Sequence, residues 1–403
     1  MTRLAKSPVA GCPHGGCPGC PLLGVPYSEQ LSAKQALVER CFSEALDGSG
    51  IALPPILAIR PSPKELGYRA TAKLALARRG PSVLLGLYRE GSHRVLDVPR
   101  CPIHHPLVAS GMRALRSLLQ RAPYLASPGL GGVGRFRYAA FQVSAFAGRL
   151  LAVLVTRSGE EEGLVRSLAA RLRERVPELS GVAWNVNPSP GNALFGPEWT
   201  LVSGEPFLEE RLGEYRFRVS PGSFLQANRE QASWAYREVA SWLEGGAGQT
   251  AWDLYCGVGG IGLHLAPGFE RVIGVETSPE AVADAAATAA SVGFEHVRFI
   301  QAGAAEALPQ LEAAGAPAAV VLNPPRKGAE RFLLERIRML GPASVVYLSC
   351  NPRTLARDAA VLCAGGGFRI HRIQPMDFLP QTAHVETAVL FCRKNGSQLS
   401  VFS

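Results

Sequence analysis

The sequence contains no run of eighteen consecutive apolar residues, so no segment is long enough to span a membrane as a helix. Its start, "MTRLAKSPVAGCPHGGC", lacks the apolar core of a secretory signal peptide. Internal repeats and low-complexity tracts are also absent, which excludes a repeat architecture. These absences favour a cytoplasmic protein. Hydrophobic residues still make up 47% of the 403 residues, enough for two or three globular domains.

Strong charge of either sign is missing as well. The chain has 42 Lys and Arg against 33 Asp and Glu, a formal net charge of +9, and its pI is near 9.2. This modest positive balance suits a polyanionic partner such as nucleic acid, although many basic enzymes share it. Composition alone therefore does not identify the partner.

Nine cysteines are present, and they are unevenly placed. Cys12, Cys17 and Cys20 lie close together, whereas the other six are scattered. In a chain without an export signal, such a cluster indicates a metal or iron–sulfur site rather than disulfides. Cys101 offers a distant fourth thiolate, and four thiolates suit either a [4Fe–4S] cluster or a tetrahedral zinc ion. Spacing alone does not separate these two, although a zinc ribbon usually has two C-x2-C knuckles and only one is present here.

Three stretches of different character follow one another along the chain. Residues 1–59 hold the cysteine cluster and a helix predicted over 28–46. Residues 60–222 contain short strand-like runs with one clear helix at about 160–175, which predicts a central α+β domain. Residues 223–403 form the predicted catalytic domain.

The catalytic domain is predicted to be α/β. From about residue 250, five strand-like runs are each followed by a helix-compatible stretch, and two further strands end the series without a helix between them. This order predicts a mostly parallel sheet whose last strand is antiparallel. It resembles the Rossmann-like sheet of class I methyltransferases.

A glycine-rich turn in "DLYCGVGGIGLHLA", 253–266, follows the first of these strands. Gly257 lets a ligand approach the backbone closely. Glu276 ends the next strand about twenty residues later, where a carboxylate can accept from ribose hydroxyls. The turn contains no basic residue, so a dinucleotide pyrophosphate is not the obvious ligand. S-adenosylmethionine, which has a ribose but no phosphate, fits better.

Another motif, "VLNPPRKG", places Asn323 at the carboxyl end of the fourth strand. Asn-Pro-Pro followed by an aromatic residue resembles the motif of amino-methyltransferases that act on adenine or cytosine. Arg326 stands where the base-stacking ring would be. This difference counts against an amino nitrogen as the methyl acceptor.

Cys350 follows the fifth strand in "VVYLSCNPRTLARD", and Glu386 begins the last strand in "PQTAHVETAVLF". A helix N-terminus beside the thiol is expected to lower its pKa, and the thiolate is the nucleophilic form. Methylation at C5 of a pyrimidine needs such a nucleophile to add to C6, and a general base to remove the C5 proton. On neighbouring strands, Cys350 and Glu386 supply both groups.

The chain resembles the RNA uridine-C5 methyltransferase family over nearly its whole length. The resemblance rests on "FLQAN", "DLYCGVGG", "GVE", "NPPRKG", "SCNPRTLARD" and "PQTAHVE", in family order and spacing. It implies that Cys350 is the nucleophile and Glu386 the base. It also implies contacts to S-adenosylmethionine from Gln226, Tyr255, Gly257, Glu276 and Asn323, and contacts to the uridine from Phe224, Gln226 and Arg326. Phe224 stacks on the extruded base in this scheme.

The subgroup that acts on 23S ribosomal RNA resembles this chain most, because it has Asn at the position of Asn323 together with the "CGVGG" turn. The same chemistry on the T-loop uridine of transfer RNA is the nearest alternative. A non-enzymatic iron–sulfur RNA-binding protein is an alternative of another class. No obligate protein partner and no membrane are inferred.

The resemblance also implies a [4Fe–4S] cluster on Cys12, Cys17, Cys20 and Cys101, with a structural or RNA-positioning role. Many family members carry an N-terminal OB-like RNA-binding domain, which is expected to be absent here because the cysteines begin at residue 12. RNA contacts are then expected from the central domain, where the basic residues are Arg69, Lys73, Arg78, Arg79, Arg89 and Arg94.

Overall fold

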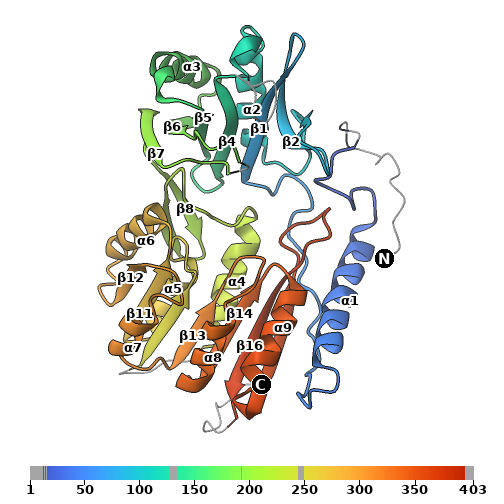
Figure 1. Cartoon of the computed structure of the whole chain (residues 1–403), viewed down its shortest axis with the longest axis vertical. Helices are drawn as coiled ribbons and strands as arrows, with labels where there is room; N and C mark the ends of the chain where they lie inside the picture. Colours follow the sequence, from blue (N-terminus) through green and yellow to red (C-terminus); the bar gives the residue numbers. More distant parts are fainter. Residues whose placement is uncertain are drawn as a thin grey trace.

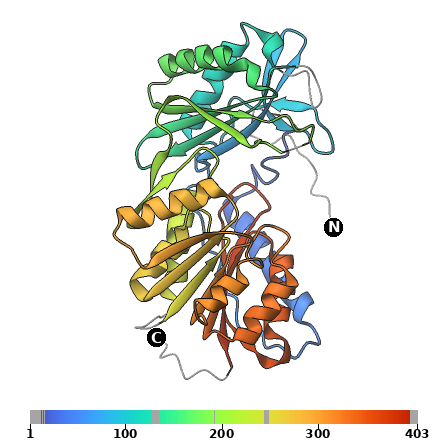
Figure 2. The ribbon, with the colours of Figure 1, turned by 60° about the vertical axis from the view of Figure 1, so that its left-hand side comes forward.

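The computed structural model describes residues 12, 14, 16–126, 134–191, 193–243 and 249–394, and these residues form two seven-stranded sheets joined by a two-stranded ribbon (Figure 1). The two sheets lie at opposite ends of the molecule, and the ribbon lies between them (Figure 2). Within these residues, no helix is long and apolar enough to cross a membrane.

The first sheet has the order β3-β2-β1-β4-β5-β6-β7. All neighbours are antiparallel except β5 and β6, which α3 connects. Helices α2 and α3 share one hydrophobic core with the sheet. The bounds are β1 Thr71–Arg79, β2 Ser82–Tyr88, β3 Val95–Asp97, α2 Pro106–Leu119, β4 Phe136–Ser144, β5 Arg149–Thr156, α3 Glu162–Arg175, β6 Leu179–Val186 and β7 Glu198–Gly204.

The second sheet has the order β12-β11-β10-β13-β14-β16-β15. Its first five strands are parallel, and β16 is antiparallel to both β14 and β15. This confirms the predicted α/β sheet with a reversed last strand. The strand bounds are β10 Thr250–Leu254, β11 Arg271–Glu276, β12 Val297–Gln301, β13 Ala319–Leu322, β14 Ser344–Ser349, β15 Phe368–Met376 and β16 Glu386–Arg393.

Helices cover both faces of the second sheet. One face packs against α4, α5 and α6, and the other against α1, α7, α8 and α9. The bounds are α1 Tyr27–Leu46, α4 Arg229–Ser241, α5 Gly260–Leu265, α6 Pro279–Ser291, α7 Leu308–Ala313, α8 Arg331–Leu340 and α9 Pro352–Cys363. Because parallel strands between two helical layers are buried on both faces, they read as the continuous apolar runs seen in the sequence.

The N-terminal helix α1 belongs to the core of the second sheet, although it precedes the first sheet in the chain. Its buried residues Val38, Cys41 and Phe42 share a core with α9, along which α1 lies in Figure 1. The chain thus crosses from the second sheet to the first after α1. It returns through the ribbon of β8 (Leu208–Leu212) and β9 (Tyr215–Val219), and β9 packs against α6.

Candidate active site

The carboxyl ends of the parallel strands form one edge of the second sheet, and the reversed strand β16 begins at this same edge. Ser349 of β14 pairs with Thr387 of β16. Cys350 directly follows Ser349 and Glu386 directly precedes Thr387, so both lie just beyond this last pair. The Glu386 carboxylate is near enough to raise the pKa of the Cys350 thiol. The fold therefore brings the thiol and the carboxyl group together from positions far apart in the sequence.

Burial governs the proton affinity of this pair. It raises the pKa of Glu386 to about 7, against the opposing charge of Arg326. Burial also raises the pKa of the Cys350 thiol, and the nearby Glu386 carboxylate adds to the effect. The sequence predicted a lowered pKa for Cys350 beside the helix N-terminus. This prediction is wrong, because burial of the thiol raises its pKa overall. Asn351 also takes up donors of the first turn of α9, since its side chain accepts from the Arg353 N–H and its carbonyl from the Leu355 N–H.

Arg326 is the group that favours the thiolate. Its charge and a hydrogen bond from its side chain lower the pKa of Cys350 against the effect of burial. Its backbone carbonyl accepts from the Asn351 side chain at 3.1 Å and from the Thr354 hydroxyl at 3.3 Å. The start of α9 thus fixes the loop that carries the guanidinium.

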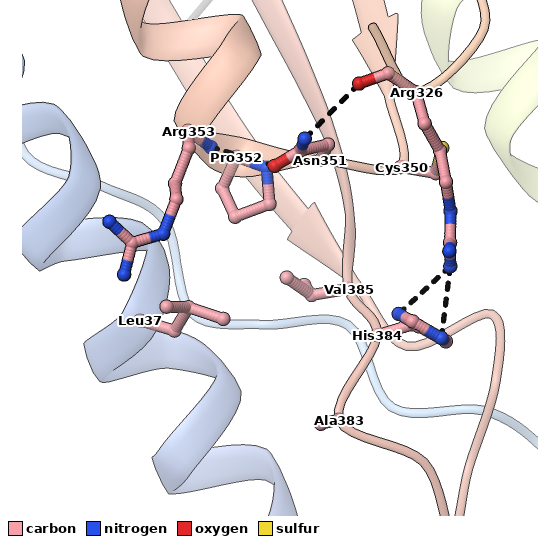
Figure 3. A pocket seen from close by; sticks show the side chains of 9 residues that line it. All are labelled: Leu37, Arg326, Cys350, Asn351, Pro352, Arg353, Ala383, His384 and Val385. Carbon is pink, nitrogen blue, oxygen red and sulfur yellow. Dashed lines mark hydrogen bonds between the residues drawn. The ribbon is translucent and has the colours of Figure 1, made fainter. Parts of the chain in front are cut away.

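His384 holds the other side of the guanidinium. The Arg326 Nη2 atom lies 2.9 Å from Nε2 and 3.1 Å from Nδ1 of His384 (Figure 3). Burial lowers the pKa of His384, and the charge of Arg326 adds to this, so the ring is neutral and can accept from Arg326. His384 was not among the residues predicted for the site. The sequence did contain one indication of its importance, because His384 lies only two residues before Glu386.

A cavity of about 250 Å³ opens beside Cys350, between α1 and the start of α9 (Figure 3). Its polar wall contains Arg326, Arg353 and His384, and its apolar wall contains Leu37 and Val385. Arg353 is a second residue that sequence analysis did not single out. The cavity therefore offers both positive charge and apolar surface directly next to the thiol.

The residues predicted for the cofactor lie along the same edge, at the ends of β10, β11 and β13. Gly257 has a left-handed backbone with φ +56°, and its N–H donates to Glu276 at 3.1 Å. Glu276 also accepts from the N–H groups of Thr277 and Ser278, so its carboxylate is fixed at the end of β11. Asn323 follows β13 and bonds through its N–H to the carbonyl of Leu254.

Two of the remaining predicted residues face different surroundings. Tyr255 follows β10, but its side chain packs against the core shared with α8 and α9. Burial raises the pKa of Tyr255 to about 12, with added effects from Glu330 and Asp358. Phe224 lies beside the glycine-rich turn and is 62% exposed, so its ring is open to a ligand.

Gln226 lies two residues after Phe224, in the segment that runs between the two sheets. Its carbonyl accepts from the Arg229 guanidinium. The adjacent carbonyl of Ala227 accepts from the Ala70 N–H next to β1. Both sheets thus fix the backbone of this segment.

The four cysteines of the predicted cluster lie close enough to affect one another. Burial, followed by the charges of Cys101, Cys17 and Cys12, raises the pKa of Cys20 to about 12. The backbone of Gly19 hydrogen bonds to the Cys17 thiol, and the backbones of Ile103 and His104 to that of Cys101.

Backbone donors of this kind stabilise thiolates, so the donor set fits a thiolate-bound group. In the part of the chain that the structure describes, however, no group of three or more Cys, His, Asp or Glu side chains could hold a metal ion as they stand. The identity of the group therefore remains a prediction.

Comparisons with known proteins agree with the fold. The family model described as tRNA (uracil-5-)-methyltransferase matches residues 205–394. An uncharacterized RNA methyltransferase of Geobacter sulfurreducens is 37% identical over 94% of this chain and 76% of its own length. An uncharacterized RNA methyltransferase of Thermosynechococcus vestitus is 35% identical over 93% of this chain and 82% of its own length.

Among solved structures, the tRNA (uracil-54, C5)-methyltransferase of Pyrococcus abyssi, in complex with S-adenosyl-L-homocysteine, is similar with a TM-score of 0.74. It is 25% identical, and the match covers 93% of this chain and 86% of that chain. The similarity includes both sheets, since it extends over nearly the whole length of the chain.

Proposed function

Because the chain belongs to the tRNA (uracil-5-)-methyltransferase family and is an S-adenosylmethionine-dependent RNA methyltransferase, we propose that it methylates C5 of a uridine through a covalent adduct with Cys350. The observation that supports this proposal is the pairing of β14 with β16, which brings the Cys350 thiol and the Glu386 carboxyl group to the same edge of the sheet, near enough to influence each other. Few other methyl acceptors would require both groups. An amino nitrogen attacks the methyl group directly and needs no thiol.

Cys350 acts first in the proposed mechanism. Its thiolate, favoured by Arg326, adds to C6 of the uracil ring, which makes C5 electron-rich. Bound S-adenosylmethionine supplies the electrophilic methyl group that C5 then takes. Glu386 removes the C5 proton, after which the bond between sulfur and C6 breaks and the thiolate is restored. A base with a pKa near 7 suits this proton transfer at neutral pH.

The cofactor is assigned to the edge formed by β10, β11 and β13. Glu276 would accept from the ribose hydroxyls, and the bare backbone of Gly257 leaves room beside it. Asn323 lies between this region and Cys350 in the strand order, so it would face both the cofactor and the base. The exposed ring of Phe224 would stack on the extruded uracil, with Gln226 beside it.

Substitution of Cys350 tests the mechanism. Cys350→Ala is expected to abolish both methylation and the covalent complex with RNA, which is seen as a band stable to denaturing electrophoresis. An amino-methyltransferase would keep its activity in this variant. A non-enzymatic RNA-binding protein would show no saturable affinity for S-adenosylmethionine in the wild type.

Ribosomal RNA, and within it 23S RNA, is the proposed substrate, on the strength of the "CGVGG" turn and Asn323. Transfer RNA is the second candidate, because the Pyrococcus abyssi enzyme that matches both sheets acts on uracil 54 of a tRNA. Mapping 5-methyluridine in both RNAs from a deletion strain separates the two. Loss confined to transfer RNA would contradict the choice of ribosomal RNA.

A [4Fe–4S] cluster is proposed on Cys12, Cys17, Cys20 and Cys101. The backbone donors to Cys17 and Cys101 support thiolate ligands at these positions. Anaerobically purified protein should be brown and contain about four irons per chain. Colourless protein with one zinc per chain would support the zinc alternative instead.

A further inference from the structure

The loop of residues 377–385, which joins β15 to β16, ends directly before Glu386. It has no regular secondary structure, yet Asp377, Gln381 and Thr382 are each at most 4% exposed. Gln381 has a left-handed backbone with φ +68°, which non-glycine residues rarely adopt. A loop with this backbone keeps its shape only where other groups hold it.

The groups that hold Gln381 come from the segment of residues 22–30, far away in the sequence. The Gln381 N–H donates to Gln30 Oε1 at 2.9 Å, and Gln30 Nε2 donates to Gln381 Oε1 at 2.9 Å. The Gln381 carbonyl accepts from the Leu22 N–H at 3.1 Å. Both backbone polar groups and the side-chain oxygen of Gln381 therefore have partners in this one segment.

Gln30 can hold Gln381 in place because its side chain is only 1% exposed and both its amide oxygen and its amide nitrogen form hydrogen bonds. Its Nε2 atom also donates to the carbonyls of Val25 at 2.9 Å and Leu22 at 3.2 Å. The side chain thus ties its own segment into a fixed shape while it binds the loop. Its removal would leave several buried polar groups without partners, including the Gln381 N–H.

A second set of contacts fixes the start of the loop. Lys34, one turn after Gln30 on α1, forms a buried ion pair with Asp377 at 2.6 Å and donates to the Leu379 carbonyl at 3.1 Å. The Tyr68 hydroxyl donates to the Pro380 carbonyl at 2.9 Å. The loop is therefore held at four residues, Asp377, Leu379, Pro380 and Gln381, before it reaches Glu386.

We infer that Gln30 is a positioning residue for the base: through Gln381 it fixes the loop that delivers Glu386 to Cys350. This inference rests on the proposed function, since it assumes that Glu386 removes the C5 proton. It also gives the cysteine-rich start of the chain a role in the chemistry, because Leu22 lies only two residues after Cys20.

The covalent mechanism allows a specific measurement, the fraction of enzyme trapped as covalent RNA adduct. A residue with only a structural role would not increase this fraction. The base acts only after Cys350 has attacked and the methyl group has been transferred. Displacement of Glu386 should therefore slow release of the product more than attack on the ring. The fraction of enzyme trapped as covalent RNA adduct should then rise while kcat falls.

Gln30→Ala is the test variant, and Gln35→Ala is its matched control on the same helix, where the Gln35 side chain bonds to Glu39 within α1. With purified full-length protein and a uridine-containing RNA fragment, Gln30→Ala should lower kcat by about tenfold to a hundredfold. It should also raise the adduct fraction several-fold. Affinity for S-adenosylhomocysteine should be unchanged, because Gly257 follows β10 and Glu276 ends β11, and both strands are separated from β16 by β13 and β14. This measurement also reports folding.

Equal kcat and equal adduct fraction in Gln30→Ala and Gln35→Ala would overturn the inference. If Gln30→Ala does not fold, Gln30→Met replaces it, since methionine fills a similar volume but cannot accept from the Gln381 N–H or donate to Gln381 Oε1. That variant should likewise raise the adduct fraction, and an unchanged fraction would contradict the inference. Failure of the proposed function is distinguishable, because wild-type enzyme would then form no adduct and Cys350→Ala would still methylate RNA.

Discussion

At the scale of single residues, two charged groups act on the Cys350 thiol in opposite directions. Burial and the Glu386 carboxylate raise its pKa, whereas the charge and hydrogen bond of Arg326 lower it. His384 keeps Arg326 in place on its far side. In the proposed mechanism, the thiolate form of Cys350 therefore depends largely on the Arg326 guanidinium, and the pKa of Glu386 depends on how well the site excludes water.

The first prediction concerns Arg326. Arg326→Gln should raise the pKa of Cys350 further, and each unit of pKa lowers the thiolate fraction about tenfold at neutral pH. The rate of Cys350 alkylation by iodoacetamide, followed against pH by mass spectrometry of the peptide, measures this directly. Arg331→Gln is the control, because Arg331 is exposed on α8 and pairs with Glu335. Identical pH profiles in wild type and Arg326→Gln would contradict the role of Arg326.

The second prediction concerns pH and Glu386. Because its pKa is raised to about 7, the base is protonated in acid, and breakdown of the covalent adduct should accelerate as the pH rises through about 7. Glu386→Gln should accumulate the adduct at every pH and lose this dependence. Rapid-quench measurement of adduct decay checks both statements.

The contribution of Glu386 to the free energy of unfolding should fall as the pH rises, whereas the rate of adduct breakdown should increase. A carboxyl group whose pKa rises from 4.5 to about 7 on folding contributes stability below pH 4.5, and this is lost as the pH rises through about 7. Between pH 4.5 and about 7, the wild type should therefore lose stability relative to Glu386→Gln. Urea denaturation at several pH values measures it.

Individual site residues could be predicted from the sequence only where the residues next to them in the chain revealed their position. The positions of Cys350 and Glu386 at strand ends could be predicted, because each lies directly beside an apolar strand-like run. His384 and Arg353 could not, since their roles depend on how a loop and two helices meet in space. The direction of the Cys350 pKa shift was also wrong, because the sequence shows the helix N-terminus but not the depth of burial.

At the scale of elements, α1 and α9 form the cavity beside Cys350, with Arg353 in its wall. The start of α9 is capped from within by Asn351, so positive charge at this point comes from the arginine side chains rather than from free backbone N–H groups. In the proposed function, RNA that presents a uridine to Cys350 would carry its neighbouring phosphates across this region. Arg353 would then be a phosphate contact.

The third prediction follows from this arrangement. Arg353→Ala should weaken RNA binding while leaving the alkylation rate of Cys350 unchanged, and the slope of log affinity against log salt should fall by about 0.7 for one lost contact to single-stranded RNA. Fluorescence anisotropy at several salt concentrations provides the measurement. Arg331→Ala on α8 is the control. An unchanged salt slope in Arg353→Ala would exclude the phosphate contact.

Element-scale predictability was good for the second sheet and poorer for the first. The strands and helices after residue 250 alternate clearly, so their type and order could be predicted. Helix α2 was missed, and Gly111 in its middle explains why, because glycine weakens a helical pattern. The structure shows the reason for this glycine, since a Cβ atom there would lie 2.8 Å from Phe141 and Leu150.

At the scale of the whole molecule, the two sheets are joined by buried polar contacts around the start of α4. Arg229 forms a buried ion pair with Glu210 of β8, and burial lowers the pKa of Arg229 to about 10 while Glu210 opposes this. Asn228 caps α4 and also donates to Ser62 and to the Phe378 carbonyl. These long-range partners leave no periodic signal in a sequence and could not be predicted from it.

The fourth prediction tests this junction. Glu210→Ala removes the partner of a buried arginine and the acceptor for the N–H groups of Ala145 and Phe146, so it should cost about 3–5 kcal/mol of stability. Glu209→Ala, its neighbour, changes an exposed pair with Arg216 and should cost less than about 1 kcal/mol. Urea denaturation compares the two. Equal midpoints would show that the ion pair does not stabilise the junction.

The direction of β16 determines which of its two ends lies beside Cys350. A parallel strand of the same length would carry Glu386 to the opposite rim, roughly 20 Å from Cys350. Since the strand is reversed, its first residue, Glu386, lies near the Cys350 thiol, and its other end near Arg393 lies beside the start of β14. Evolution can therefore lengthen or shorten the hairpin at that remote end without altering the spacing of the reacting pair.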